Sequence, residues 1–393
     1  MMIDTVSVKT GSNMTVMAPI VAAEIFEIET QFVVPYKLAE GTHATTRAIL
    51  LKFTDGDGVV GWGEADPNVT FTGESPGDAV RVLHDTLVPH VLGQTNPEPG
   101  RIDLTLDSLV PRHLSAKGAV TMALLDILGK RLRAPVATLL GGVIHESLPV
   151  LWPLSNGTAD DDIRVIEEKS VQGFSSFMLK MGASPVADEV KRVAALEARY
   201  GSRVKFIADA NQGWSLREAR EFLDGVRGSN LAFVEQPIQK DDLEGMALLA
   251  GGTAFSISAD ESVVDVAHAA KIAKLGAASI FSIKSSKNGG PLRAQRIAAV
   301  AAAFGIRCYM NSMLEFGITQ SASLQHAVTI SNLVDVGHAF MSTLRLVEDP
   351  TDFSSFVRNG TVYFPNRDGL GVQVDEAHVR RMAVSSCALG ARG

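Results

Sequence analysis

The spacing of apolar and polar residues changes twice along the chain. From Ala23 the two kinds alternate through three short segments, which predict β-strands, with a turn at the Asp-Gly-Asp-Gly stretch 55–58. Apolar residues then recur every three or four positions in 78–93 and 119–142, which predicts helices, and a Gly-Gly pair ends the second segment. A strand meander followed by helices predicts an α+β domain.

From Leu148 to about residue 345 the pattern switches to alternating strand and helix. Four segments carry the one-sided apolar stripe of a helix that lies on a barrel, namely 188–201, 215–228, 265–277 and 291–305. Such alternation predicts a parallel α/β barrel. After Asp349, a strand-like TVYF and a Gly-rich segment are expected to pack back on the first domain.

We therefore divide the chain into three parts. Residues 1–20 are expected to be a loose N-terminal extension. Residues 21–147 form the α+β domain, which 350–393 complete, and residues 148–349 form the barrel.

Charged residues end five consecutive apolar runs of the barrel, at intervals of 24 to 29 residues: Lys180, Asp209, Glu235, Asp260 and Lys284. One βα unit of an eight-unit barrel takes about that length, and all strand C-termini open onto one face. Three carboxylates meeting there would repel one another without a cation, and oxygen ligands select a hard ion such as Mg²⁺ or Mn²⁺. The two lysines would flank it as proton-transfer groups, which points to an enzyme.

Each of these charged residues could also have a purely structural role. A carboxylate at a strand end can cap the next helix or pair with a basic residue, although three at consecutive repeats favour a shared cation. Lys180 and Lys284 fall on facing walls, where a metal and desolvation would lower the lysine pKa, or else each forms a structural ion pair. Asn211 and Glu261 either orient the metal ligands or are ordinary polar residues of surface loops.

Further polar residues lie near the same face. Glu315, after the seventh strand run, could bond Lys284 or a substrate group, or stabilise a helix start. Lys287 is interpreted as solvated or facing an anion, and His338 is the histidine placed near this face.

Composition narrows the class of protein. The chain has 46% hydrophobic and 20% charged residues, as globular proteins do, and its net charge of −8 argues against a nucleic-acid partner. Two cysteines exclude a disulfide framework, and Cys308 lies in an apolar run as a buried thiol. Apolar runs are too short for a membrane span and no signal-peptide core is evident, so we expect a cytoplasmic protein.

Several motifs between Ala23 and Val374 resemble those of one family: VPYKLA, AKGAVTMALLDILGKRL, KMGASPV, VEQPI, ADES, GAASIFSIKSSKNGGP and SMLE. Together they are similar to the muconate lactonizing enzyme (muconate cycloisomerase) subgroup of the mandelate racemase/muconate lactonizing enzyme family, in the enolase superfamily. The resemblance implies an α/β fold, a (β/α)7β-type TIM barrel with an α+β capping domain. It also implies a homo-oligomer acting on a small carboxylate substrate.

The resemblance assigns roles to particular residues. It implies a divalent metal, Mg²⁺ or Mn²⁺, and the residues that it matches to catalysis or metal binding are Asp209, Glu235 and Asp260 as ligands, Lys180 and Lys284 as acid/base groups, and Glu315 as a third catalytic residue. The loops 36–42 and 68–73 match the capping segments that shape specificity.

One position departs from the subgroup. Its Lys-x-Lys motif reads Met178-Leu179-Lys180 here, so Lys180 lacks the neighbouring positive charge that would lower its pKa. We therefore expect a muconate cycloisomerase type of enzyme acting through an enolate. The alternative is a racemase, epimerase or dehydratase of an amino-acid derivative or hydroxy acid, and a third possibility is a metal-binding protein without catalysis.

Overall fold

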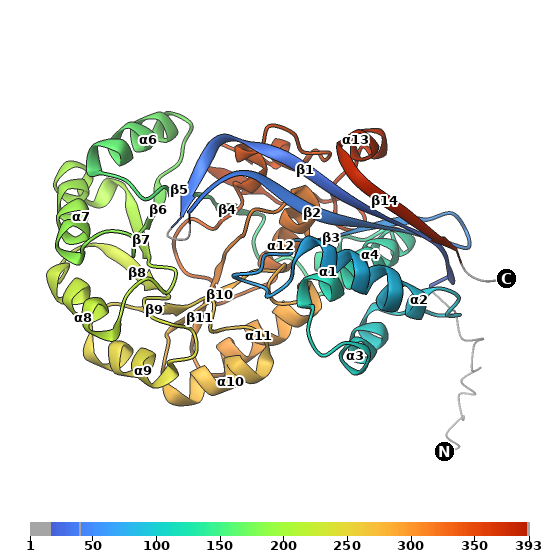
Figure 1. The fold of residues 1–393 in the computed structure, drawn as a ribbon, viewed down its shortest axis with the longest axis horizontal. Helices are drawn as coiled ribbons and strands as arrows, with labels where there is room; N and C mark the ends of the chain where they lie inside the picture. The colour runs from blue at the N-terminus through green and yellow to red at the C-terminus, as the bar shows by residue number, and fades with distance from the viewer. Residues whose placement is uncertain (1–16, 39–40, 391–393) are drawn as a thin grey trace, which may run out of the picture.

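The largest sheet of the protein is parallel and curls around an apolar core (Figure 1). The computed structural model describes residues 17–38 and 41–390. The order of strands in this sheet is β11-β10-β9-β8-β7-β6-β5. Its members are β5 (Leu151–Leu154), β6 (Ser176–Lys180), β7 (Lys205–Asp209), β8 (Leu231–Glu235), β9 (Ile257–Ala259), β10 (Ile280–Ile283) and β11 (Arg307–Met310).

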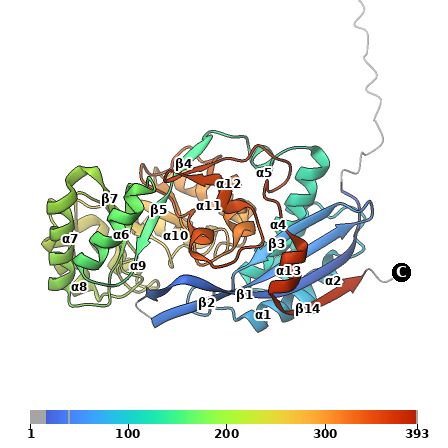
Figure 2. The ribbon, with the colours of Figure 1, turned by 90° about the horizontal axis from the view of Figure 1, so that it is seen from above.

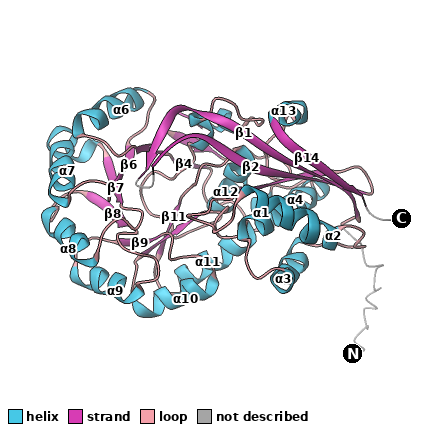
Figure 3. Cartoon of the chain, viewed as in Figure 1, coloured by secondary structure: helices cyan, strands magenta, loops and turns pink. Residues whose placement is uncertain are grey.

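One helix follows each of these strands and packs outside the sheet (Figure 3). The helices are α6 (Ala159–Val171), α7 (Val186–Tyr200), α8 (Leu216–Gly225), α9 (Leu243–Gly252), α10 (Val266–Leu275), α11 (Pro291–Ala303) and α12 (Gly317–Ala327). A 3-10 turn, η2 (Gly201–Arg203), follows α7. Capping boxes at Thr158 and Ser215 fix the starts of α6 and α8, because each hydroxyl accepts a backbone N–H that the helix leaves unpaired.

The eighth strand position is reduced to isolated backbone pairs. Leu333 pairs with Cys308 of β11, and His338 pairs with Val150 just before β5, so segment 333–338 closes the barrel. The next helical turn is the 3-10 segment η3 (Ser342–Arg345). The predicted (β/α)7β barrel is confirmed.

The capping domain is built on an antiparallel sheet of order β14-β1-β2-β3. Its strands are β1 (Ile20–Leu38), β2 (Gly41–Asp55), β3 (Val60–Ala65) and β14 (Ala383–Gly390). Its helical segments are α1 (Pro76–Val82), the π-turn η1 (Leu83–Leu87), α2 (Val88–Val91), α3 (Pro99–Leu109), α4 (Leu114–Leu132) and α5 (Val136–Leu139).

Helix α4 lies directly on β3. A Cβ at Gly63 would stand 1.9 Å from the carbonyl oxygen of Ala119, so the glycine permits the close approach. The prediction of one helix over 119–142 is wrong in one respect. Pro135 separates α4 from α5, because proline cannot continue the hydrogen-bonding of the preceding turn.

The C-terminal tail contributes to both domains. β14 pairs antiparallel with β1, and α13 (Glu376–Met382) packs on the same strand. The strand-like TVYF instead joins a small sheet of β12 (Val357–Arg358), β13 (Thr361–Tyr363) and β4 (Ser147–Pro149), beside the 3-10 turn η4 (Phe353–Phe356). Residues 1–16 of the expected extension lie outside the described residues, and the proposed boundaries at 147 and 349 stay a prediction.

The two domains share an apolar cluster, and the β1–β2 hairpin reaches from the capping sheet across to the barrel (Figure 2). Phe26 and Phe32 of β1 pack in this cluster with Phe316 and Ile318 at the start of α12. The hairpin is thereby held over one end of the barrel. Among the described residues, no helix combines the length and apolarity that crossing a membrane requires.

Candidate active site

Strand register brings the predicted charged residues to one level of the barrel. Lys180 pairs with Asp209, and Asp209 pairs with Glu235, as the last residues of β6, β7 and β8. β9 and β10 end one residue before Asp260 and Lys284. The side chains of all five are buried or nearly so. The structure therefore brings together the five residues that the sequence placed at strand ends.

The backbone turns sharply directly after two of the carboxylates. Asn211, Gln212 and Gln236 have positive φ angles of 43°, 68° and 32°, a left-handed conformation that non-glycine residues rarely adopt. Gln236 also accepts the backbone N–H of Asp260 at 2.9 Å through its side-chain oxygen. Strained backbone of this kind is characteristic of functional sites. Here it sets the direction in which the chain leaves the strand ends that carry Asp209 and Glu235.

Lys180 is held by two side chains of the next strand end. Its Nζ lies 2.5 Å from Asp209 Oδ2 and 3.1 Å from Asn211 Oδ1. The backbone N–H of Asn211 donates to the other oxygen of Asp209 at 3.0 Å, and its amide donates to Glu261 at 3.3 Å. Asn211 thus connects Lys180, Asp209 and Glu261, a positioning role that the sequence left open.

On the facing wall, two lysines share one carboxylate. Lys284 Nζ lies 2.5 Å from Asp260 Oδ2, and Lys287 Nζ lies 2.9 Å from Oδ1 and also donates to the Asp260 carbonyl. Of the two expectations for Lys287, solvation is wrong, and the contact with an anion is confirmed, the anion being the Asp260 carboxylate. The loop after β10 folds inward, so Lys287 is 2% exposed and its charge is balanced by Asp260.

Glu235 occupies the middle of the carboxylate trio. Its Oε1 accepts Asn311 Nδ2 at 2.7 Å, whereas its buried Oε2 has no hydrogen-bond partner among the described residues. Burial and repulsion from Asp209 and Asp260 raise the pKa of Glu235 well above its ordinary value. A buried carboxylate with an unsatisfied oxygen between two other carboxylates fits a divalent cation bound through oxygen ligands.

The three carboxylates are not arranged around a common point in this structure. Within residues 17–38 and 41–390, no group of three or more His, Cys, Asp or Glu side chains is arranged to hold a metal ion. Lys180 and Lys284 instead neutralise Asp209 and Asp260. The lysine ammonium groups are the positive charges that the carboxylates face in this structure.

The pKa values of these lysines follow from their partners. Burial alone would lower the pKa of Lys180, but the Asp209 carboxylate outweighs burial and holds the pKa above its usual range. The same balance, with Asp260, raises the pKa of Lys284. The sequence led us to expect the opposite direction beside a metal. A cation on the carboxylates would cancel their effect and add its own charge, and both changes lower a lysine pKa.

Glu315 lies deeper than expected. It accepts Gln320 Nε2 at 2.8 Å and the backbone N–H of Met313, and burial raises its pKa to about 7. It does not line the pocket that holds the lysines. Its predicted catalytic role stays a prediction.

Two other residues singled out in the sequence are structural. His338 is buried, accepts the backbone N–H of Met310 at 3.1 Å and stacks on Tyr309, and burial lowers its pKa to about 3. Cys308 is buried, which raises its thiol pKa to about 12, as expected of an inert thiol.

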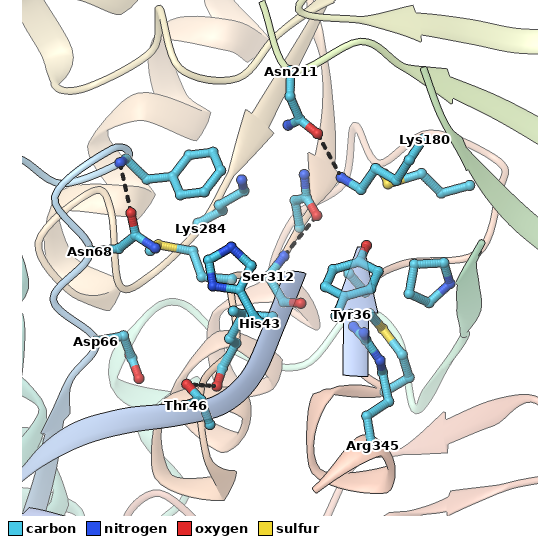
Figure 4. Close-up of a pocket in the computed structure, with 18 of the residues that line it drawn as sticks. Tyr36, His43, Thr46, Asp66, Asn68, Lys180, Asn211, Lys284, Ser312 and Arg345 are labelled. Carbon is cyan, nitrogen blue, oxygen red and sulfur yellow. Dashed lines mark hydrogen bonds between the residues drawn. The ribbon is translucent and has the colours of Figure 1, made fainter. Parts of the chain in front are cut away.

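Lys180 and Lys284 face a pocket between the barrel and the capping domain (Figure 4). The capping domain contributes Tyr36 and Asn68, and the barrel also contributes Arg345. Sequence reasoning missed Arg345, and it missed Asn311, the partner of Glu235. Asn311 directly follows β11. The argument that placed the carboxylates, namely that residues at the C-terminal ends of barrel strands share one face, could therefore have identified Asn311 as well.

Two family descriptions match the chain. Residues 20–141 match the mandelate racemase / muconate lactonizing enzyme N-terminal domain, and residues 162–378 match the enolase C-terminal domain-like family. The chain belongs to the mandelate racemase/muconate lactonizing enzyme family. The family lies in the enolase superfamily and its enzymes use a divalent metal, typically Mg²⁺.

Relatives within this family carry different activities in their names. The chain is 33% identical to muconate cycloisomerase 1 of Pseudomonas putida, over 89% of this chain and 94% of that protein. It is 31% identical to L-Ala-D/L-Glu epimerase of Bacillus subtilis, over 90% and 96%. The crystal structure of N-succinyl Arg/Lys racemase from Bacillus cereus superposes with a TM-score of 0.90 at 27% identity, covering 94% of this chain and all of that one.

Proposed function

We propose that the protein is a metal-dependent acid/base isomerase of a small carboxylate, with Asp209, Glu235 and Asp260 as ligands for Mg²⁺ or Mn²⁺. The observation that carries the proposal is the pair of buried lysines on facing walls, each beside one member of the carboxylate trio. When bound, the cation would supply positive charge that stabilises negative charge developing on a substrate carboxylate.

Muconate cycloisomerisation is the first candidate reaction. One carboxylate of the diacid adds across the conjugated double bond, and a lysine ammonium delivers a proton to the carbon next to the other carboxylate. Lys180 or Lys284 can deliver it, because both line the pocket. The resemblance to muconate cycloisomerases supports this reaction.

Racemisation or epimerisation is the second candidate, and the placement of the two lysines favours it. β6 and β10 lie four positions apart in the sheet, so Lys180 and Lys284 approach a bound substrate from opposite sides. One lysine can then remove the proton next to a carboxylate while the other returns a proton to the opposite face.

Proton exchange separates these candidates. Muconates, dipeptides and N-acyl amino acids would be incubated with Mg²⁺ in D₂O, and deuterium next to the carboxylate measured by NMR. For an epimerase, Lys180→Gln and Lys284→Gln should each retain exchange with only one stereoisomer. For a cycloisomerase, muconate should be consumed, and one of the two variants should retain turnover. The exposed Lys240→Gln is the matched control.

Metal binding is tested separately by titration calorimetry with Mn²⁺. We expect one site in the wild type and at least about tenfold weaker binding in Glu235→Gln, because a neutral amide is a poor ligand for a hard cation. Glu244→Gln, at an exposed position of α9, is the control. A metal-binding protein without catalysis would pass this test and fail the exchange test with every substrate.

We also propose a homo-oligomer, which the family resemblance supports. Light scattering coupled to gel filtration measures the mass directly. A monomer mass of 41.8 kDa at micromolar concentration would contradict the proposal.

A further inference from the structure

The cationic residues that line the pocket differ in how their charges are balanced. They are Arg47, Lys180, Lys284 and Arg345. The two lysines pair with strand-end aspartates, and Arg47 pairs with Glu27 at 3.0 Å and with Glu29. Arg345 contacts aromatic rings instead, and no Asp or Glu in the described part of the chain forms an ion pair with it. Among the described residues that line the pocket, Arg345 is therefore the cation without a carboxylate partner.

Arg345 is held in place by the capping domain. Its guanidinium carbon lies 3.8 Å from the centre of the Tyr36 ring and 5.6 Å from that of Phe32, both on β1. Stacking fixes the plane of the guanidinium, and Arg345 also donates a side-chain hydrogen bond to Tyr36, which leaves the remaining N–H donors of the fork for a ligand. Burial lowers the pKa of Arg345, yet an arginine keeps its charge at neutral pH. A positioned, partly desolvated cation is stabilised by an anion.

Arg345 lies at the end of the pocket away from the reactive groups. In Figure 4, Tyr36 stands between Lys180 and Arg345. The pocket also contains Asp66, whose side chain accepts the Thr319 hydroxyl at 2.9 Å and forms no ion pair with Arg345 among the described residues.

We infer that Arg345, stacked on Tyr36, binds a second anionic group of the substrate, at the end opposite the carboxylate whose neighbouring carbon gains or loses a proton. The inference rests on the proposed function, because it takes the pocket as the site of reaction. The planar fork of arginine matches a carboxylate with two parallel hydrogen bonds. Arg345 is thus a specificity-determining residue that selects dianionic substrates.

Substrates of two different lengths could place an anionic group at Arg345. Arg345, Tyr36 and Pro153 also border a second cavity, which continues outward past Trp152 and Val34. A short diacid would place its second carboxylate against Arg345 from within the pocket. A longer acyl chain would reach the same guanidinium near the outer cavity. The ligand chemistry is the same in both cases.

Two matched pairs of ligands test the inference by calorimetry in the presence of Mg²⁺. The short pair is cis,cis-muconate and hexa-2,4-dienoate, and the long pair is N-succinylglycine and N-butanoylglycine. Within each pair a methyl group replaces the terminal carboxylate. We expect the dianion of at least one pair to bind roughly 10- to 100-fold more tightly, as for hydrogen bonds to charged groups. The pair that shows the preference reports the length.

Variants assign that preference to Arg345. Arg345→Met should abolish it, and Arg345→Lys should keep part of it, because the charge remains and the fork is lost. Phe32→Leu should retain it, which separates charge from packing, and Arg47→Met is the matched control because Arg47 is already neutralised. Melting temperatures identify any variant that does not fold.

Two results would overturn the inference: equal binding within both pairs by the wild type, or an unchanged preference in Arg345→Met together with Arg345→Lys. Failure of the proposed function looks different. In that case no substrate exchanges a proton or turns over, while the preference for dianions and its loss in Arg345→Met persist.

Discussion

The backbone N–H of Thr319, in the barrel, donates a hydrogen bond of 2.8 Å to Glu64, in the capping domain. The second oxygen of Glu64 accepts the N–H of Phe316 at 2.6 Å. These are donors that the start of α12 leaves without partners in its own helix. The sequence led us to consider Glu315 for helix-start stabilisation, but the contact comes from Glu64 on β3.

Glu64→Gln should destabilise the protein. One carboxylate oxygen becomes an NH₂ group that faces a backbone N–H, so a buried donor loses its acceptor at a cost of about 1–3 kcal/mol. Urea unfolding followed by circular dichroism measures the change in free energy, with exposed Glu244→Gln as the control. Equal stabilities of the two variants would show that the contact between the domains contributes nothing measurable.

Met178→Lys should shift the acidic limb of the pH–rate profile to lower pH. Met178 lies two residues before Lys180 on β6, so both side chains point to the same face and both line the pocket. A second ammonium group would lower the pKa of Lys180 by like-charge repulsion, by about one unit or more. The measurement is kcat/KM against pH with Met178→Leu as the control. An unmoved limb would mean that Lys180 is not the titrating base.

Glu74→Gln should reduce the dependence of stability on pH. Burial raises the pKa of Glu74 to about 7, although it accepts the N–H of Ser115 at 3.0 Å. The pKa of a glutamate in the unfolded chain is about 4.3, so the native state binds this proton more tightly than the unfolded state does. The free energy of unfolding therefore falls as pH rises from about 4 to about 7.

The size of that effect follows from the shift in pKa. The loss amounts to about 3–4 kcal/mol across the window for this one group. Other carboxyls with a raised pKa, such as Glu315, add to the same slope, so the difference between wild type and variant is the quantity to measure. Parallel curves for the two proteins from pH 5 to pH 8 would contradict the prediction.

The strand-end residues could be read from the sequence because the barrel repeats one unit. An apolar run that ends in a charged residue, followed by an amphipathic helix, places Asp209 and Glu235 at adjacent strand ends whatever the details of packing. The same argument would have reached Asn311. It could not reach Glu64, whose partners lie about 250 residues away along the chain.

Local sequence therefore determined the order of elements, the barrel and the set of charged residues at its open end, since these depend on periodicity and on the common direction of parallel strands. The tertiary structure alone decided the pairing of those charges. Lys287 turns inward to Asp260, and Arg345 is left facing the pocket against Tyr36. Such pairings depend on how loops from separate elements meet in space, and the distances between those loops are set only when both domains have packed.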